Sequence, residues 1–172
     1  EEFKSLSKSF ENKNYNSEIK SLKSKIYLVK SEFENLVASK AKEIYELIIN
    51  NGYDVVDFSY KESGVAGFIK KTSNGIISYP GSRVFESVNN SNKWVSKDKE
   101  NKEEIISFID RNLMSNMKEF ISYFEKKYIK YNTALELKNY LYVFGILSEL
   151  QKQVVNYRDE NEVILISDLS EL

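Results

Sequence analysis

The sequence predicts an α+β protein, in which a long antiparallel helical hairpin or small bundle carries an inserted antiparallel β-meander of three to four strands. Apolar residues recur at spacings of three and four in residues 17–50 and again after residue 103, as they do along one face of a helix. Between residues 53 and 79 the apolar period changes to two, which is typical of strands. Tight turns separate these runs, and contiguous strands joined by tight turns favour an antiparallel sheet over a parallel one.

The first long helix is predicted from Ser17 to Asn50, after a short or frayed helix within residues 1–16. Asn51 and Gly52 follow it, and such a pair is typical of the left-handed cap that ends many helices. A helix of this length is expected to pack along another long helix. Its apolar face comprises Ile19, Leu22, Ile26, Val29, Phe33, Leu36, Ile44, Leu47 and Ile48.

The predicted meander follows from residue 53. Asn74 and Gly75 predict a type I′ turn between its second and third strands, because both residues tolerate a positive φ. Residues 83–88 are either a fourth strand or the start of irregular structure. Residues 89–102 are polar apart from Trp94 and Val95, and predict an exposed loop with one aromatic anchor. The three strands that we expect before these segments lie at residues 53–60, 65–71 and 76–79.

Two further helices are predicted as an antiparallel hairpin, from residue 103 to 130 and from 132 to 157. Thr133 and Glu136 have the spacing of a capping box, which places the start of the second helix at residue 132 or 133. That helix has an apolar arc wide enough to contact at least two neighbours. Gly145 lies within it and predicts a close crossing with another helix. The main apolar face comprises Tyr140, Val143, Leu147, Leu150, Val154 and Tyr157.

The predicted organisation has three parts. Residues 1–52 and 103–157 form the helical bundle, and residues 53–102 form the meander with its exposed loop. Residues 158–172 form an acidic tail that contains a short apolar strand at residues 163–166. The chain begins with Glu, so we expect a processed chain or a piece of a longer protein, and the sequence leaves its compartment open.

Composition argues against most catalytic chemistry. The chain has no Cys and no His, which excludes thiol nucleophiles, imidazole bases and zinc sites built on those ligands. Asp54 and Asp57 are expected on opposite faces of the first strand, so they do not form a convergent carboxylate pair. We therefore expect no enzyme, no cofactor and no metal site. The net charge is -1, and no run of about 18 apolar residues occurs, so no membrane span is predicted within the chain.

Basic residues interleaved with aromatic ones form a possible nucleic-acid surface. Cations neutralise phosphates and aromatic rings stack on bases, so the combination is what single-stranded nucleic acid requires. Three of the basic residues lie in the helix predicted at residues 103–130, and three lie on the predicted sheet. The six candidate residues are Lys126, Lys127, Lys130, Lys70, Lys71 and Arg83.

The sequence best supports a non-catalytic protein-protein interaction or assembly module that uses helical faces or a sheet edge. A nucleic-acid-binding subunit of a larger complex is one alternative, and an extracytoplasmic ligand-sensing domain is the other. The stretch SNGIISYPGS, from Ser73 to Ser82, follows a long helix and is similar to the hairpin of extracytoplasmic Cache sensor domains. That resemblance implies a hairpin here, a sheet that continues downstream, and a ligand-sensing function.

Overall fold

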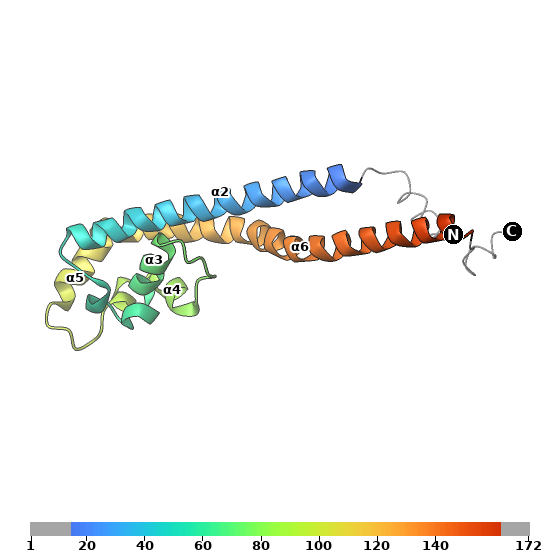
Figure 1. Ribbon diagram of the computed structural model, residues 1–172. Coiled ribbons are helices and arrows are strands. Elements are labelled where there is room, and N and C mark those ends of the chain that lie inside the picture. The colour runs from blue at the N-terminus through green and yellow to red at the C-terminus, as the bar shows by residue number, and fades with distance from the viewer. Residues whose placement is uncertain (1–14, 163–172) are drawn as a thin grey trace. The chain divides into compact units, whose positions relative to one another are not determined.

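The structure is a computed structural model, and it describes residues 15–162 of the 172-residue chain (Figure 1). Every regular element in this range is helical, and the range contains no strand, which contradicts the predicted α+β class. The elements are α2 (Tyr15–Asn50), η1 (Val55–Asp57), η2 (Lys61–Ser63), α3 (Val65–Ser73), α4 (Ser82–Ser87), η3 (Ser91–Trp94), α5 (Lys102–Phe108), η4 (Ile109–Leu113) and α6 (Met114–Asn161).

The chain divides into two compact units, and the division cuts through both long helices. One unit is Tyr27–Thr133, which contains most of α2, the first part of α6 and everything between them. The other joins Glu1–Ile26 to Ala134–Leu172, and its described residues are 15–26 and 134–162.

Within the unit Tyr27–Thr133, α2 and α6 run antiparallel. Phe33 on α2 stacks on Tyr131 on α6 with 4.5 Å between ring centroids, and Lys40 pairs with Glu119 nearer the other end. The interior is apolar and aromatic, so its burial is the main stabilising contribution. Its fully buried side chains include Val37, Ala41, Ile48, Ile105, Ile109, Leu113, Met117 and Phe124.

The residues between α2 and α5 form a small helical lobe beside the end of this hairpin, where Figure 1 shows α3 and α4. Trp94 anchors the lobe, because its side chain is completely buried and its Nε1 donates a hydrogen bond to the Ser87 carbonyl at 2.9 Å. Lys99 binds the Asp57 carboxylate at 2.6 Å and so joins the last loop of the lobe to its first turn.

The predicted second strand is the helix α3. Its side chains at positions 65, 68, 69 and 72 are all buried, and this spacing of three and four is helical. The apolar run of residues 65–71 therefore has the period of a helix and not the period of two that predicts a strand. Gly67 explains how α3 packs so closely on the preceding turn. A Cβ atom there would lie 2.3 Å from the Glu62 carbonyl oxygen, so only glycine fits.

The predicted first strand is replaced by the short turns η1 and η2. Asp54 and Asp57 do not lie on opposite faces of a strand, because they close a capping box around η1. Asp57 Oδ2 accepts a hydrogen bond from the Asp54 backbone N–H at 2.8 Å. Tyr60 and Lys61 then adopt positive φ values of 61° and 45°, which reverses the chain before α3.

The Asn74–Gly75 pair ends a helix and does not form a hairpin turn. Gly75 has a φ of 80°, its N–H bonds the Thr72 carbonyl, and the Ile76 N–H bonds the Lys71 carbonyl. This is the left-handed cap that also ends α2 at Gly52. Residues 76–81 then form no strand, and α4 occupies the position of the expected fourth strand.

The two predicted C-terminal helices are one helix. α5, η4 and α6 follow one another without a break, and η4 is a single π turn. Thr133 does not cap a new helix, because its Oγ1 donates a hydrogen bond to the Ile129 carbonyl one turn earlier. Within the unit Tyr27–Thr133, the helical hairpin is therefore formed by α2 with the first part of this continuous helix. The strand predicted at residues 163–166 lies outside the described residues.

Candidate functional site

The part of α6 from Tyr140 to Tyr157 presents an apolar face to solvent. Six of its side chains recur at alternating spacings of three and four, which are the a and d positions of a heptad repeat. They are between 47% and 63% exposed, although large apolar residues of a folded chain are usually buried. We call this face the heptad seam, and it consists of Tyr140, Val143, Leu147, Leu150, Val154 and Tyr157.

The heptad seam lies on the far side of α6 from the face that is buried in the same unit. Ala134 and Leu141, which are one heptad apart, are each 6% exposed. At 3.6 residues per turn, the heptad seam is centred about 160° around the helix from these two residues. The helix therefore buries one face within the chain and leaves a second apolar face uncovered by the described residues.

The surroundings of the heptad seam carry little charge. Between residues 139 and 157 the charged residues are Glu149 and Lys152, and these two form an ion pair at 3.8 Å. Phe144 and Ile146 flank the heptad seam and are 56% and 62% exposed. The apolar surface is thus broader than the six seam residues, and it contains no unbalanced charge.

Sequence reasoning identified the residues of the heptad seam and expected this helix to contact at least two neighbours. It also predicted that Gly145 marks a close helix crossing. Among residues 15–162 that prediction is wrong, because none of their atoms lies within 4 Å of a Cβ atom built at Gly145. The exposure of the face depends on where the rest of the chain packs, which periodicity alone does not report.

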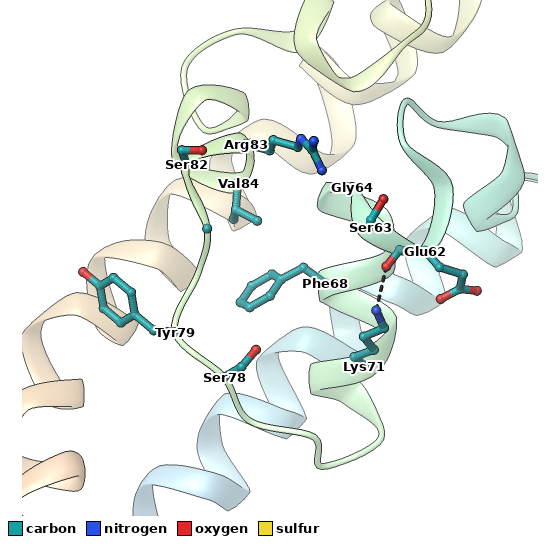
Figure 2. A pocket seen from close by; sticks show the side chains of 11 residues that line it. Glu62, Ser63, Gly64, Phe68, Lys71, Ser78, Tyr79, Ser82, Arg83 and Val84 are labelled. Carbon is teal, nitrogen blue, oxygen red and sulfur yellow. Dashed lines mark hydrogen bonds between the residues drawn. The ribbon is translucent and has the colours of Figure 1, made fainter.

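A second candidate site is a cavity of about 340 Å³ between α3 and α4, which we call the α3–α4 cavity (Figure 2). Phe68 and Val84 form its apolar floor and are 9% and 4% exposed. Tyr79 lies at one side, and its ring centroid is 4.8 Å from that of Tyr128 on α6. The polar side chains of its wall are Ser63, Ser78, Ser82, Glu62, Lys71 and Arg83.

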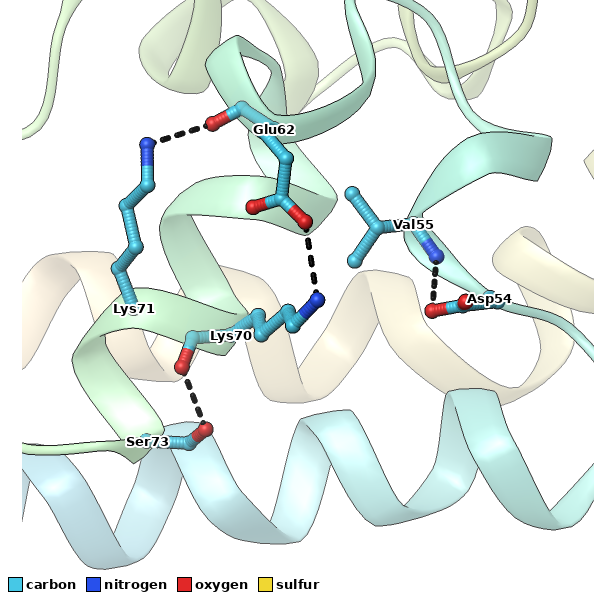
Figure 3. Close-up of polar contacts among 6 residues, drawn as sticks. All are labelled: Asp54, Val55, Glu62, Lys70, Lys71 and Ser73. Carbon is cyan, nitrogen blue, oxygen red and sulfur yellow. Dashed lines mark hydrogen bonds and ion pairs between the residues drawn. The ribbon is translucent and has the colours of Figure 1, made fainter.

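The α3–α4 cavity has an excess of positive charge. Glu62 turns its carboxylate away from the cavity and pairs with Lys70 at 2.9 Å, and that hydrogen bond raises the pKa of Lys70 (Figure 3). Lys71 donates a hydrogen bond to the Glu62 carbonyl oxygen at 2.7 Å, and within residues 15–162 it has no carboxylate partner. Arg83 lies over the Tyr60 ring, 4.2 Å from the centroid, and likewise forms no ion pair in that range.

The six residues predicted as a nucleic-acid surface lie on two separate elements of the structure. Lys126, Lys127 and Lys130 are exposed on α6, and none of them forms an ion pair with a described residue. The other three belong to the lobe, where Lys70 is neutralised by Glu62 whereas Lys71 and Arg83 line the α3–α4 cavity. Sequence reasoning found these cations but missed the cavity, since the pairing of Arg83 with Tyr60 arises only in the folded lobe.

Neither long helix, in the part of the chain that is described, has a stretch apolar enough to cross a membrane. The same part contains no group of three or more carboxylates placed to hold a metal ion. Comparison with protein-family models, with curated proteins and with solved structures finds no match to this chain.

Proposed function

We propose that this chain is a non-catalytic assembly module that pairs with a second copy of itself through the heptad seam. The observation that carries the proposal is the exposure of an apolar face with an a/d repeat on a long helix. Such a face is stabilised when a second helix with the same repeat packs against it, because knobs from each helix enter holes on the other. The partner that is certain to carry this repeat is another copy of the chain.

Charge favours a second copy over a charged partner. Self-association brings identical residues near one another, so an unbalanced charge at the interface would oppose it. The heptad seam and its flanks contain no such charge between residues 139 and 157, because Glu149 and Lys152 compensate each other. Two copies can therefore meet in a parallel or an antiparallel arrangement without repulsion.

The available area is also sufficient. The six side chains of the heptad seam, with Phe144 and Ile146 beside it, are at least 47% exposed. Together they present on the order of 1,000 Å² of surface, compared with about 800 Å² per partner in a typical stable interface. Burying most of this surface offsets the loss of translational and rotational freedom on association.

Disulfide cross-linking tests the proposal directly, because the chain contains no Cys and each introduced Cys is unique. Val143→Cys, Leu150→Cys and Tyr157→Cys place single thiols along the heptad seam, and Lys152→Cys places one on another face of the helix as a control. In a parallel pair all three seam variants form a covalent dimer under mild oxidation. In an antiparallel pair only the variant nearest the twofold axis does so.

A monomer in all three seam variants would contradict the proposal, and so would a Lys152→Cys dimer that forms as fast as the seam dimers. A monomeric chain would instead favour a different protein as the partner of the heptad seam.

A further inference from the structure

We propose that the α3–α4 cavity binds a small organic anion, in which a carboxylate or phosphate group is attached to an apolar part. This inference concerns the Tyr27–Thr133 unit and is independent of self-association through the heptad seam. It rests on the charge of the cavity wall, the apolar floor and the fixed position of the two cations.

The first step is the charge of the cavity. Lys71 and Arg83 both line the cavity, and neither is neutralised by a carboxylate within residues 15–162. The carboxylate of Glu62 points away from it toward Lys70, as Figures 2 and 3 show. A negatively charged group entering the cavity therefore meets two uncompensated cations, and charge-assisted hydrogen bonds are the strongest that it can accept there.

Contacts within the lobe hold both cations in position. The Tyr60 ring lies under the Arg83 guanidinium at 4.2 Å and holds it by a cation–π contact. The Glu62 carbonyl holds one proton of the Lys71 ammonium and leaves the others available. Because both groups are positioned before a ligand arrives, less side-chain entropy is lost on binding.

The third step is the apolar floor. The Phe68 ring projects into the middle of the cavity, and Val84 lies beside it (Figure 2). Serine hydroxyls at positions 78 and 82 add donors around this floor, whereas the Ser63 hydroxyl donates to the Tyr60 carbonyl oxygen at 2.8 Å. Inorganic anions gain nothing from an apolar floor, whereas an aryl or alkyl group attached to the anion does. A volume of about 340 Å³ is at the small end of ligand sites, which matches a compact molecule of this class.

The experiment is a titration of ¹⁵N-labelled full-length protein with phenyl phosphate and, separately, with benzoate, followed by amide NMR. We expect saturable shifts centred on Ser63, Gly64 and Ser82, with weaker effects from inorganic phosphate and from the neutral analogue benzyl alcohol. Arg83→Gln and Lys71→Gln should each raise the dissociation constant by about tenfold or more, as expected for loss of a hydrogen bond to a charged group. Both residues are exposed, so the variants retain the fold.

Lys126→Gln is the matched control, because it removes the same charge from an exposed position on α6 that does not line the cavity. It should leave the dissociation constant unchanged. The proposal is overturned if neither anion shifts these amides at millimolar concentration, if benzyl alcohol binds as tightly as benzoate, or if Lys126→Gln weakens binding as much as Arg83→Gln. It is also overturned if a single-stranded oligonucleotide binds more tightly than either anion and its affinity depends equally on Lys126 and Arg83, since the cations would then form a nucleic-acid surface.

Discussion

Leu141 and Leu147 lie less than two turns apart on α6, yet Leu141 is 6% exposed and Leu147 is 54% exposed. The difference reflects the face of the helix on which each residue lies, because both have the same side chain. Exposing a Leu in place of burying it forgoes about 1.5–3 kcal/mol of transfer free energy. The six exposed apolar side chains of the heptad seam therefore lower the stability of the isolated chain relative to one in which they are buried. Association with a second helix would bury them.

Two glycines should respond to the same substitution with opposite signs. Gly67→Ala places a methyl group 2.3 Å from the Glu62 carbonyl oxygen, so we expect the free energy of unfolding to fall by about 2 kcal/mol. The methyl group of Gly145→Ala, in a helix interior, meets no described residue within 4 Å, and we expect a gain of up to about 1 kcal/mol. Urea unfolding of the two variants measures both changes, and a Gly67→Ala variant as stable as the wild type would refute the packing described for α3.

Tyr131 donates a hydrogen bond from its hydroxyl to Glu34 Oε1 at 2.8 Å and is 6% exposed. Tyr131→Phe should therefore lower the free energy of unfolding at pH 7 by about 1 kcal/mol. Burial, and then this hydrogen bond, raise the pKa of the Tyr131 phenol. A raised pKa in the folded state gives stability that is complete below the unfolded value and is lost as pH rises above about 10.

The difference between the wild type and Tyr131→Phe should therefore shrink above pH 10, which urea unfolding at pH 7, 9 and 10.5 would show. Tyr142→Phe, at an exposed position, is the control and should show neither effect. A Tyr131→Phe variant that is as stable as the wild type at pH 7 would contradict this prediction.

Asp57 and Lys99 give the lobe a dependence on acidic pH. The hydrogen bond from Lys99, followed by that from the Asp54 backbone, lowers the pKa of Asp57. A lowered pKa in the folded state gives stability that is present above the unfolded value of about 4 and is lost as pH falls through the folded value. Both side chains are partly exposed, so we expect a contribution of about 0.5–1 kcal/mol.

Asp57→Asn should therefore lower stability at pH 6 and approach the wild type below pH 4. The exposed Glu103→Gln substitution is the control for general charge effects. A constant difference between Asp57→Asn and the wild type from pH 6 to pH 3 would rule out the proposed ion-pair contribution.

Thr72 is completely buried in α3, and in the described structure its hydroxyl has no hydrogen-bond partner. A buried hydroxyl without a partner destabilises the fold, so Thr72→Val, which keeps the shape, should raise the free energy of unfolding by about 1 kcal/mol. Thr72→Ser keeps the hydroxyl and loses a methyl group, so it should be less stable than the wild type. Thermal unfolding ranks the three proteins, and a destabilised Thr72→Val would show that the hydroxyl is satisfied by a bound water or ligand.

The long helical segments were predictable from the sequence, because apolar residues recur along them with a sustained spacing of three and four. The first helix ends where Asn51 and Gly52 indicated, and Gly52 adopts the expected positive φ of 80°. The helical-bundle part of the prediction fits the structure. The predicted break at Tyr131 was wrong. Tyr131 stacks on Phe33, and this tertiary contact stabilises a continuous helix although the local sequence resembles a helix cap.

The lobe was not predictable by the same reasoning. Short apolar runs such as residues 65–71 fit a strand or a helix, and Asn–Gly pairs end helices as readily as they form hairpins. Neither signal distinguishes a helix from a strand in this region. The close approach of Gly67 to Glu62 and the burial of Trp94 stabilise the helical arrangement. The α3–α4 cavity depends on this packing, so its residues appeared in the sequence only as scattered cations and aromatics.

The most direct test of assembly through the heptad seam is the molar mass of the intact protein by size-exclusion chromatography with light scattering, measured over a hundredfold range of concentration. We expect a dimer that dissociates on dilution. Leu147→Glu should be a monomer with an unchanged fold, because the side chain is exposed in the single chain. Ile129→Glu, at a 76% exposed position of α6 outside the heptad seam, should remain dimeric. A wild-type protein that stays monomeric at the highest concentration, or a dimer that Leu147→Glu does not weaken, would contradict self-assembly through this face.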